Sequence, residues 1–267
     1  MISLEETLRI HLTLWAGYQS REVSQVLDYS DKENRFEEQW QRDHYFAVGR
    51  DALRIVMSEL LINGRGVPSS ILDFPSGSGR VTRHLRAMFP EARIGACDLY
   101  SSHIHFCERE FGAEPIQSSE SLATLDIGEW DLIFCGSLLT HLPHPLFIEA
   151  IRFIARSLTP NGIAIATVEG RHAIYIQDHK WKLIGDDLFE IARAQYHETG
   201  FGFVDYDSAF RDAAFAAQAT YGVTLINPSR LMGEIQGLED VRILGFRERA
   251  WDDHQDVVVF GRPGVNA

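Results

Sequence analysis

The sequence lacks an excess of positive charge, a long apolar run and a secretory leader. Lys and Arg number 25 against 38 Asp and Glu, which gives a formal net charge of −13. Phosphate binding needs a basic face, so this balance argues against nucleic acid as the main partner. No apolar run reaches the ~20 residues of a membrane span, and the opening letters MISLEE lack the basic and apolar segments of a signal peptide. We therefore expect a cytoplasmic protein that binds neither nucleic acid nor membrane.

Cysteine is also scarce. Cys97, Cys107 and Cys135 form an odd set without the spacing of metal ligands. Two of them fall in expected core strands, which favours buried, reduced thiols. His144 follows Pro143 and has no carboxylate at ligand spacing, so the sequence predicts no metal site.

What the sequence does contain is a strand, a glycine turn and a helix in succession. Residues 71–80 read ILDFPSGSGR. Residues 71–74 form a short apolar run that is typical of a buried parallel strand. The next residues make a tight turn in which Gly77 and Gly79 let a ligand approach the backbone. Apolar residues then recur at helical spacing, and such a helix opens with unpaired N–H groups that suit a polar ligand.

An acidic residue stands at the end of the next expected strand. Asp98 follows residues 93–97 and lies 19 positions after Gly79. An acid about 20 residues beyond the glycines typically accepts hydrogen bonds from the ribose of an adenosine-containing cofactor. The alternative is that Asp98 only caps the helix expected over residues 100–111. We favour the ribose role because the turn and the acid occur together at the expected separation.

The glycine spacing indicates which cofactor is involved. A dinucleotide fingerprint needs glycines in the pattern G-x-G-x-x-G, but Thr82 occupies the third position. The stretch instead resembles the first motif of class I S-adenosylmethionine-dependent methyltransferases, where an acid precedes the first glycine by four residues, as Asp73 does. Three further segments resemble the same family, namely WDLIFC at 130–135, GSLLTHL at 136–142 and LTPNG at 158–162. The resemblance covers residues 71–168.

This resemblance implies S-adenosyl-L-methionine as the cofactor and assigns residues to it. Gly77 and Gly79 would border its amino acid part, and Asp98 would bind its ribose. Asp73 would organise the turn. Pro75 and Ser76 are turn residues at positions where the family usually has glycine and often cysteine, which alters the shape of the turn. The remaining expected contacts are Leu99 against the adenine, Ser119 near its edge, and Gly136 and Ser137 near the sulfur.

Strands alternate with helices after residue 70. We expect strands at 71–74, 93–97, 114–117, 131–135 and 163–168, and helices at 80–89, 101–111 and 145–158. This order favours an α/β fold with a Rossmann-like, doubly wound and mostly parallel sheet. By resemblance, residues 241–246 and 256–260 would be its last two strands, the final one antiparallel. Residues 1–62 are expected to form an N-terminal helical extension, and residues 63–267 the cofactor-binding domain.

A long insertion at residues 170–227 interrupts the alternation. It is longer than a connection needs and starts at the carboxyl end of a strand, so we expect it to form a lid over the substrate. Gly200, Gly202 and Gly222 would bend two strands over the pocket. A homodimer interface is the competing hypothesis, since exposed aromatics also mark association surfaces. The aromatic residues of the insertion are Tyr175, Trp181, Phe189, Tyr196, Phe201, Phe203, Tyr206, Phe210, Phe215 and Tyr221.

Two histidines are candidates for catalysis. His141 lies where the resembled family often has a histidine, and it either contacts the substrate or only packs a helix. His254 lies in a loop expected over residues 248–255, on the ligand side of the sheet. There it is a candidate base, with Asp253 fixing its tautomer. The alternative is that this segment is a polar hairpin turn that caps an edge strand.

Together these features predict a methyltransferase that uses S-adenosylmethionine on a small polar acceptor, either a metabolite or a sugar. The mechanism would be in-line displacement at the sulfonium methyl group, which needs alignment at about 3 Å and exclusion of water. A base is needed only if the nucleophile must lose a proton. An NAD-dependent oxidoreductase and a non-catalytic S-adenosylmethionine-binding module of the same fold are the alternatives.

Overall fold

The structure is a computed structural model that describes residues 3–31, 34–208 and 218–263. Phe210 and Phe215 of the expected lid lie outside the described residues. The chain divides into two compact units. The first holds Met1–Ser118 with Trp130–Phe134, and the second holds Ser119–Glu129 with Cys135–Ala267. No helix within the described ranges is both long and apolar enough to cross a membrane.

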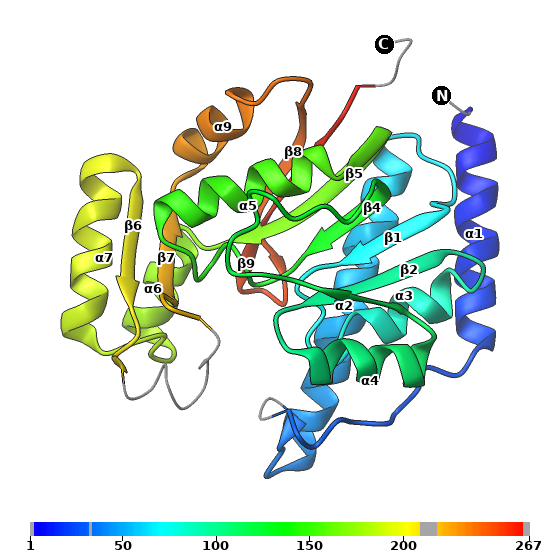
Figure 1. Ribbon diagram of the computed structural model, residues 1–267, viewed down its shortest axis with the longest axis horizontal. Coiled ribbons are helices and arrows are strands. Elements are labelled where there is room, and N and C mark those ends of the chain that lie inside the picture. The colour runs from blue at the N-terminus through cyan, green and yellow to red at the C-terminus, as the bar shows by residue number, and fades with distance from the viewer. Residues whose placement is uncertain (1–2, 32–33, 209–217, 264–267) are drawn as a thin grey trace. The chain divides into compact units, whose positions relative to one another are not determined.

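The first unit starts with two helices and continues with parallel strands and helices in alternation (Figure 1). Its strands pair side by side: β1 pairs with β2 and β4, and β2 pairs with β3, all in parallel. Asp73 lies opposite both Ala96 and Phe134, so the carboxyl ends of β1, β2 and β4 meet at one edge. The elements are α1(Leu4–Ser20), α2(Gln39–Ile62), β1(Ser70–Asp73), α3(Thr82–Met88), β2(Arg93–Asp98), α4(Ser101–Phe111), β3(Glu114–Gln117) and β4(Trp130–Cys135).

Local sequence explains where several of these elements begin and end. The Ser3 hydroxyl accepts a hydrogen bond from the Glu6 N–H at the start of α1, which satisfies one of the unpaired donors of the first turn. Helix α4 stops at Gly112, whose φ of +60° lies in the left-handed region that glycine adopts without strain. The side chains of Leu72 in β1 and Ile133 in β4 are fully buried. Such central parallel strands consist mainly of apolar residues, because both faces of the sheet are covered.

The second unit contains the remaining strands and an additional two-stranded sheet. β5 pairs with β9, and β9 with β8, both antiparallel, while β6 and β7 form a separate antiparallel pair. The elements are α5(His144–Arg156), β5(Leu158–Val168), α6(Arg171–His179), α7(Asp186–Thr199), β6(Phe201–Asp205), β7(Gly222–Ile226), α9(Pro228–Gln236), β8(Arg242–Trp251) and β9(Gln255–Gly261).

The strand order of the main sheet confirms the expected fold class. The order is β3-β2-β1-β4-β5-β9-β8. Only β9 runs against its neighbours, as the antiparallel last strand of a Rossmann-like methyltransferase sheet should. The expectation for the cysteines is also confirmed, because Cys97, Cys107 and Cys135 are buried and form no disulfide.

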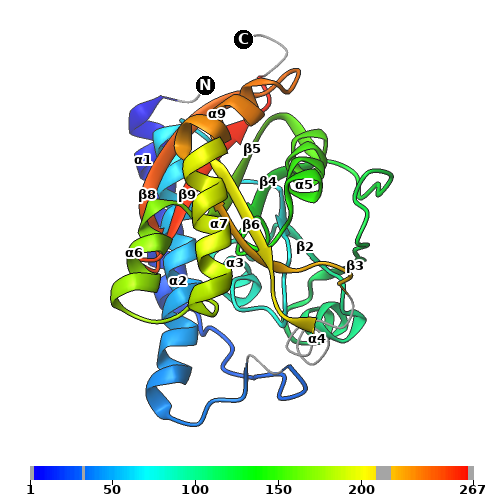
Figure 2. The same cartoon turned by 90° about the vertical axis from the view of Figure 1, so that its left-hand side faces the viewer.

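The insertion has a core of its own. Helix α7 lies alongside strand β6 (Figures 1 and 2), and Phe189 and Tyr196 pack inward with Val223 and Leu225. Gly202 has a packing role in this core. A Cβ at Gly202 would lie 1.9 Å from the Ala192 carbonyl oxygen, so this position needs glycine to let β6 pack closely on α7.

The end of the chain departs from the expectation in one respect. Strand β8 continues to Trp251, so residues 248–251 belong to a strand and the predicted loop over 248–255 is wrong. The connection to β9 is a tight turn in which Asp252 and Asp253 have φ values of +56° and +50°. Two successive residues at positive φ match the hairpin turn whose twist suits paired strands. His254 is the last residue of this turn, directly before β9.

Candidate functional site

In the first unit, the glycine turn after β1 is held by backbone hydrogen bonds. The Ser76 N–H donates to the Cys97 carbonyl (2.9 Å), and the Gly79 N–H donates to the Ser76 carbonyl (3.0 Å). Pro75 follows a cis peptide bond. The two glycines have different roles. A Cβ at Gly79 would lie 2.2 Å from the Phe111 ring, whereas one at Gly77 would meet no described atom within 4 Å. Gly79 therefore allows close packing, and Gly77 leaves the backbone open to a ligand.

Asp73 organises the turn by a direct bond to the next helix. Its Oδ2 accepts a hydrogen bond of 2.6 Å from the Thr82 hydroxyl, and both side chains are almost completely buried. Burial raises the pKa of Asp73 to about 7, although the bonds from Thr82 oppose the shift. Thr82, the residue at the third fingerprint position, thus anchors β1 to α3 through its hydroxyl.

Asp98 ties the end of β2 to the same turn. Its Oδ2 accepts a hydrogen bond from the Gly77 N–H (2.9 Å), and its Oδ1 accepts one from the Tyr100 N–H (2.9 Å). The carboxylate is buried, and the residue is only 5% exposed. The bond from Tyr100 resembles the capping role considered as the alternative, but the bond from Gly77 reaches across to the glycine turn. The structure therefore brings the predicted ribose acid and the predicted loop glycine into direct contact.

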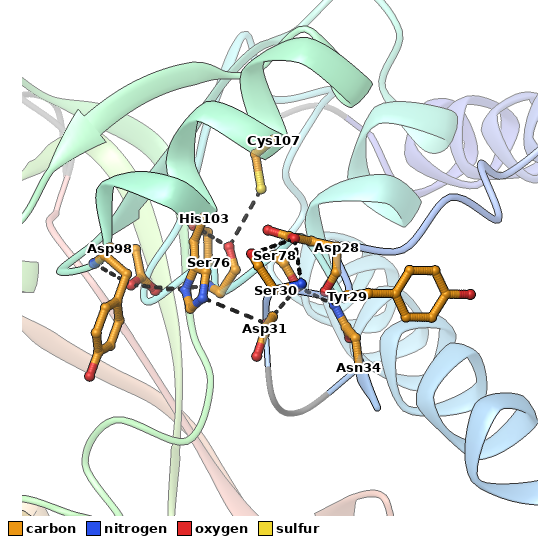
Figure 3. A network of polar contacts seen from close by, with 12 residues as sticks. Asp28, Tyr29, Ser30, Asp31, Asn34, Ser76, Ser78, Asp98, His103 and Cys107 are labelled. Atoms are coloured by element: carbon orange, nitrogen blue, oxygen red, sulfur yellow. Dashed lines mark hydrogen bonds and ion pairs between the residues drawn. The ribbon is translucent and has the colours of Figure 1, made fainter. Parts of the chain in front are cut away.

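A polar network extends from Asp98 to the segment before α2 (Figure 3). His103 Nδ1 lies 3.4 Å from Asp98 Oδ1, and its Nε2 lies 3.8 Å from Asp31 Oδ2. The Ser78 hydroxyl donates to Asp31 Oδ2, and the Asn34 side-chain amide donates to the Ser78 hydroxyl, each at 2.6 Å. Sequence reasoning did not find Asp31, Asn34 or His103, because no spacing rule links the segment before α2, or a histidine within α4, to the glycine turn.

Leu99 and Ser119 lie at the ends of their strands as expected, but neither shows a binding role by itself. The Leu99 side chain is half-buried, and its carbonyl accepts a hydrogen bond from the Gln117 side chain (2.8 Å). Ser119 belongs to the second unit, is exposed, and donates its hydroxyl to the Ser121 carbonyl (2.8 Å).

In the second unit, the loop after β4 is strained at one residue. Gly136 is half-buried, and Ser137 has a φ of +57°, which is unusual for a residue with a side chain. The Ser137 N–H donates to the Thr167 hydroxyl (2.8 Å). The Gln255 amide donates to the Ser137 hydroxyl (3.0 Å). Backbone strain that neighbours hold in place is often a sign of function.

His254 lies beside an acid other than the one predicted. Its Nε2 is 3.2 Å from Glu169 Oε1, and Glu169 follows β5 and is buried. Asp253, the predicted partner, instead accepts hydrogen bonds from Arg249 (2.6 and 2.9 Å) and lies near Lys180. The prediction that Asp253 fixes the His254 tautomer is therefore wrong. Adjacent side chains at a tight turn point in different directions, and that of Asp253 is bonded to Arg249.

The environment of His254 favours its charged form. Burial lowers the pKa of His254, but the contact with Glu169 and the charges of Asp252 and Asp256 raise it by more, so the net shift is upward. Trp181 packs edge-on against the imidazole with ring centroids 5.7 Å apart. An imidazole between a buried carboxylate and an aromatic ring has a restricted orientation, which a proton-transferring group requires.

His141 contacts the insertion. Its Nδ1 is 2.7 Å from the Gly222 carbonyl, which can only accept, so this nitrogen carries the proton. Its ring stacks on Tyr221 at 4.5 Å, with Tyr206 at 6.1 Å. Burial raises the pKa of Tyr206, and the charge of Glu169 adds to the shift. These contacts show that two aromatics of the insertion reach the loop after β4.

The chain matches a known family over this region. Residues 72–164 match the family model of the methyltransferase domain. This range contains the glycine turn, Asp98 and the loop after β4. Over these residues the chain is similar to class I methyltransferases. Methyltransferases of this class use S-adenosylmethionine as their cofactor.

Solved structures share the fold of this chain at low sequence identity. A S-adenosylmethionine-dependent methyltransferase from Clostridium acetobutylicum ATCC 824 has a TM-score of 0.54 and 13% identity, over 80% of this chain and 92% of that one. The PH0226 protein from Pyrococcus horikoshii OT3 has a TM-score of 0.55 and 12% identity, over 85% and 92%. The CcbJ methyltransferase from Streptomyces caelestis has a TM-score of 0.51 and 11% identity, over 81% and 90%. No curated protein matches the methyltransferase by sequence.

The donor set of the methyltransferase fits an organic cofactor. Within the described ranges, no group of three or more His, Cys, Asp or Glu side chains is arranged to hold a metal ion. What the two units offer instead is a glycine turn beside a buried carboxylate in the first, and a hydroxyl, an amide and a histidine–carboxylate pair in the second. These groups can hold a polar ligand by hydrogen bonds, and the carboxylates and the histidine can also accept a proton.

Proposed function

We propose that this methyltransferase transfers the methyl group of S-adenosylmethionine to a small polar acceptor, either a metabolite or a sugar. The observation that carries the proposal is the hydrogen bond between the Gly77 N–H and the Asp98 carboxylate. It places a buried acid next to Gly77, where an added side chain would meet no described neighbour. A polar ligand that approached this backbone would find the acid already oriented.

In this proposal Asp98 accepts hydrogen bonds from the ribose hydroxyls of the cofactor. The open backbone at Gly77 and its neighbours Pro75, Ser76 and Gly79 borders the methionine part. Asp73 acts indirectly, since its bond to Thr82 holds β1 against α3. Leu99 and Ser119 remain proposed contacts of the adenine, and Gly136 and Ser137 proposed neighbours of the sulfur. The bonds that hold Ser137 at a strained φ support its assignment.

The proposed reaction is an in-line displacement. A lone pair of the acceptor atom attacks the methyl carbon, and the carbon–sulfur bond breaks with its electron pair returning to sulfur. S-adenosylhomocysteine leaves, and the acceptor gains the methyl group. Alignment at about 3 Å and exclusion of water account for most of the rate in such a step.

We propose His254 as the base when the acceptor is a hydroxyl or another group that must lose a proton. The support is its restricted position between the buried Glu169 and Trp181. Because the pKa of His254 is raised, its neutral form becomes available only as pH rises, and it is then a stronger base than an unperturbed histidine. His141 is proposed as an acceptor contact, since the insertion fixes its ring.

We infer that residues 170–227 form a lid on a domain of residues 63–267, with residues 1–62 as an N-terminal extension. Tyr206 and Tyr221 support the lid, because both approach His141. Phe189 and Tyr196 are assigned to the insertion's own core instead. The net charge of −13 supports a neutral or cationic acceptor over nucleic acid. Three buried cysteines without a disulfide are typical of the cytoplasm, where we place the protein.

The test is methyl transfer from methyl-labelled S-adenosylmethionine to a panel of hydroxylated metabolites, amino compounds and sugars. We expect label in one chemical class of acceptor and a loss of about 100-fold in the His254→Gln variant, the usual scale for a general base. Cofactor affinity should be unchanged in that variant. Binding of the cofactor without label transfer across the whole panel would favour the non-catalytic alternative.

A further inference from the structure

His103 lies between two carboxylates of the first unit. Its imidazole reaches Asp98 with Nδ1 at 3.4 Å and Asp31 with Nε2 at 3.8 Å, as the dashed lines in Figure 3 show. The side chain is only 17% exposed, and the Tyr100 ring packs beside it at 5.1 Å. His103 therefore contacts the acid that the proposed function assigns to the ribose.

The acceptor positions of Asp98 are nearly all in use. A carboxylate offers roughly four lone-pair positions, two on each oxygen. On Oδ2 the Gly77 N–H takes one position, and on Oδ1 the Tyr100 N–H takes one. His103 Nδ1 lies 3.4 Å from Oδ1, so its side chain covers the second position on this oxygen without making a well-aligned hydrogen bond to it. One position remains, whereas a ribose that presents two hydroxyls to the carboxylate needs two.

One of the three contacts must therefore give way. The two N–H donors belong to the backbone of the turn and of the start of α4, and they cannot move without breaking local structure. The His103 contact is longer than a good hydrogen bond, and within the described residues His103 Nδ1 has no partner at hydrogen-bonding geometry. A histidine side chain can also rotate about two bonds. His103 is thus the contact that a ribose can replace.

We propose that His103 is a positioning residue of the cofactor site, which holds Asp98 in the unliganded protein and is displaced from it by the ribose diol. The proposal rests on the proposed function, because it takes Asp98 as the ribose acid. Displacement leaves His103 facing Asp31, whose carboxylate is bonded to Ser78 of the glycine turn. The segment before α2 would then keep the displaced side chain beside the site.

The displacement should change the protonation of His103. In the described part of the chain, the titratable groups that act on it are Asp98 at the end of β2, Asp31 and Asp28 before α2, and Tyr100 before α4. Burial lowers the pKa of His103, but the bond and charge of Asp98 and the charges of Asp31 and Asp28 raise it by more. Losing Asp98 lowers the pKa again. Binding then releases protons over the pH range between the two values, and affinity rises with pH there.

Adenosine is the probe that isolates this effect, because it has no group that titrates near neutral pH and carries the whole ribose. Calorimetric titrations at pH 6 to 8.5, each in two buffers with different ionisation enthalpies, give the number of protons released. Between the pKa values of His103 in the free and the bound protein, we expect release of a fraction of one proton per adenosine. In this pH window the affinity should rise by less than about tenfold per pH unit, and above it the affinity should be constant. The 2′,3′-dideoxy analogue, which has no diol, should release none.

Two variants and one control separate the proposal from a general effect of histidine. His103→Gln should abolish proton release and make adenosine affinity independent of pH. Asp31→Asn, which keeps His103, should move the window to lower pH without removing it. His105→Gln is the matched control, since His105 is on the same helix, exposed, and pairs with Glu108. It should behave as the wild type.

The outcomes are distinguishable. Adenosine binding that neither releases protons nor depends on pH would overturn the proposal while leaving Asp98 as the ribose acid. Equal proton release with the dideoxy analogue would also overturn it, because the diol would not be the displacing group. If neither adenosine nor S-adenosylhomocysteine bound at any pH, the proposed function itself would fail.

Discussion

The contact between Glu169 and His254 gives the sharpest prediction. Replacing Glu169 by Gln removes the negative charge 3.2 Å from His254 Nε2 and keeps the size of the side chain. The two side chains are 6% and 20% exposed, so water screens the interaction only in part. We expect Glu169→Gln to lower the pKa of His254, because the remaining burial favours the neutral imidazole.

The size of the effect follows from the cost of a charged hydrogen bond. Such bonds contribute about 1.5–3 kcal/mol, and one pKa unit corresponds to about 1.4 kcal/mol. The misaligned geometry of this contact places its energy at the low end of that range, and its loss in Glu169→Gln should lower the pKa of His254. The raised pKa of His254 also makes the stability of the folded protein depend on pH. A raised histidine pKa stabilises the folded protein below the unfolded value near 6.5, and this contribution is lost as pH rises through the folded value.

Nuclear magnetic resonance of ¹³C-labelled histidine measures the titration without knowledge of the acceptor. The chain has 11 histidines, and the His254→Gln spectrum identifies the relevant signal. Asp253→Asn is the matched control, because Asp253 is adjacent in sequence but bonded to Arg249. We expect a larger shift in Glu169→Gln than in Asp253→Asn. The reverse order would refute the pairing described here and restore the assignment made from sequence.

Three further predictions concern other parts of the chain. Burial raises the pKa of Asp73 from 3.8 to about 7 in the folded protein. The free energy of unfolding should therefore fall as pH rises from about 4 to about 7. Asp73→Asn should flatten this pH dependence in urea titrations. Gly202→Ala should destabilise the protein by more than about 2 kcal/mol in the same assay, since the added carbon would lie 1.9 Å from the Ala192 oxygen. Tyr221→Ala removes the ring that stacks on His141. It should reduce methyl transfer at least about tenfold and leave the affinity for S-adenosylhomocysteine unchanged. A loss of that affinity with unchanged methyl transfer would contradict the proposal that the insertion is a lid.

The fold could be predicted because its signals are local. The glycine turn, the acid after β2 and the alternation of strands and helices each lie within a short window. Thr82 marks the limit of such reasoning. Its position excluded a dinucleotide fingerprint, but nothing in the sequence showed that its hydroxyl bonds to the buried Asp73.

The partners of the charged residues could not be predicted, because they depend on contacts between distant segments. Asp253 was the natural partner of His254 by sequence, yet the Asp253 side chain bonds to Arg249, and His254 lies beside Glu169, which follows β5. Likewise Asp31 reaches Ser78 across 47 positions. Proximity in sequence predicts side-chain pairs in helices, but not at a hairpin turn or between a connecting segment and a sheet.

The central claim is that Asp98 and the glycine turn bind the adenosyl cofactor. Calorimetric titration of S-adenosylhomocysteine and of NAD into the wild type and Asp98→Ala tests it most directly. We predict binding of S-adenosylhomocysteine but not NAD, and a loss of about 1–3 kcal/mol in the variant, the scale of hydrogen bonds to a charged group. Circular dichroism should show that the variant remains folded. Binding of NAD alone, or unchanged affinity in the folded variant, would contradict the account.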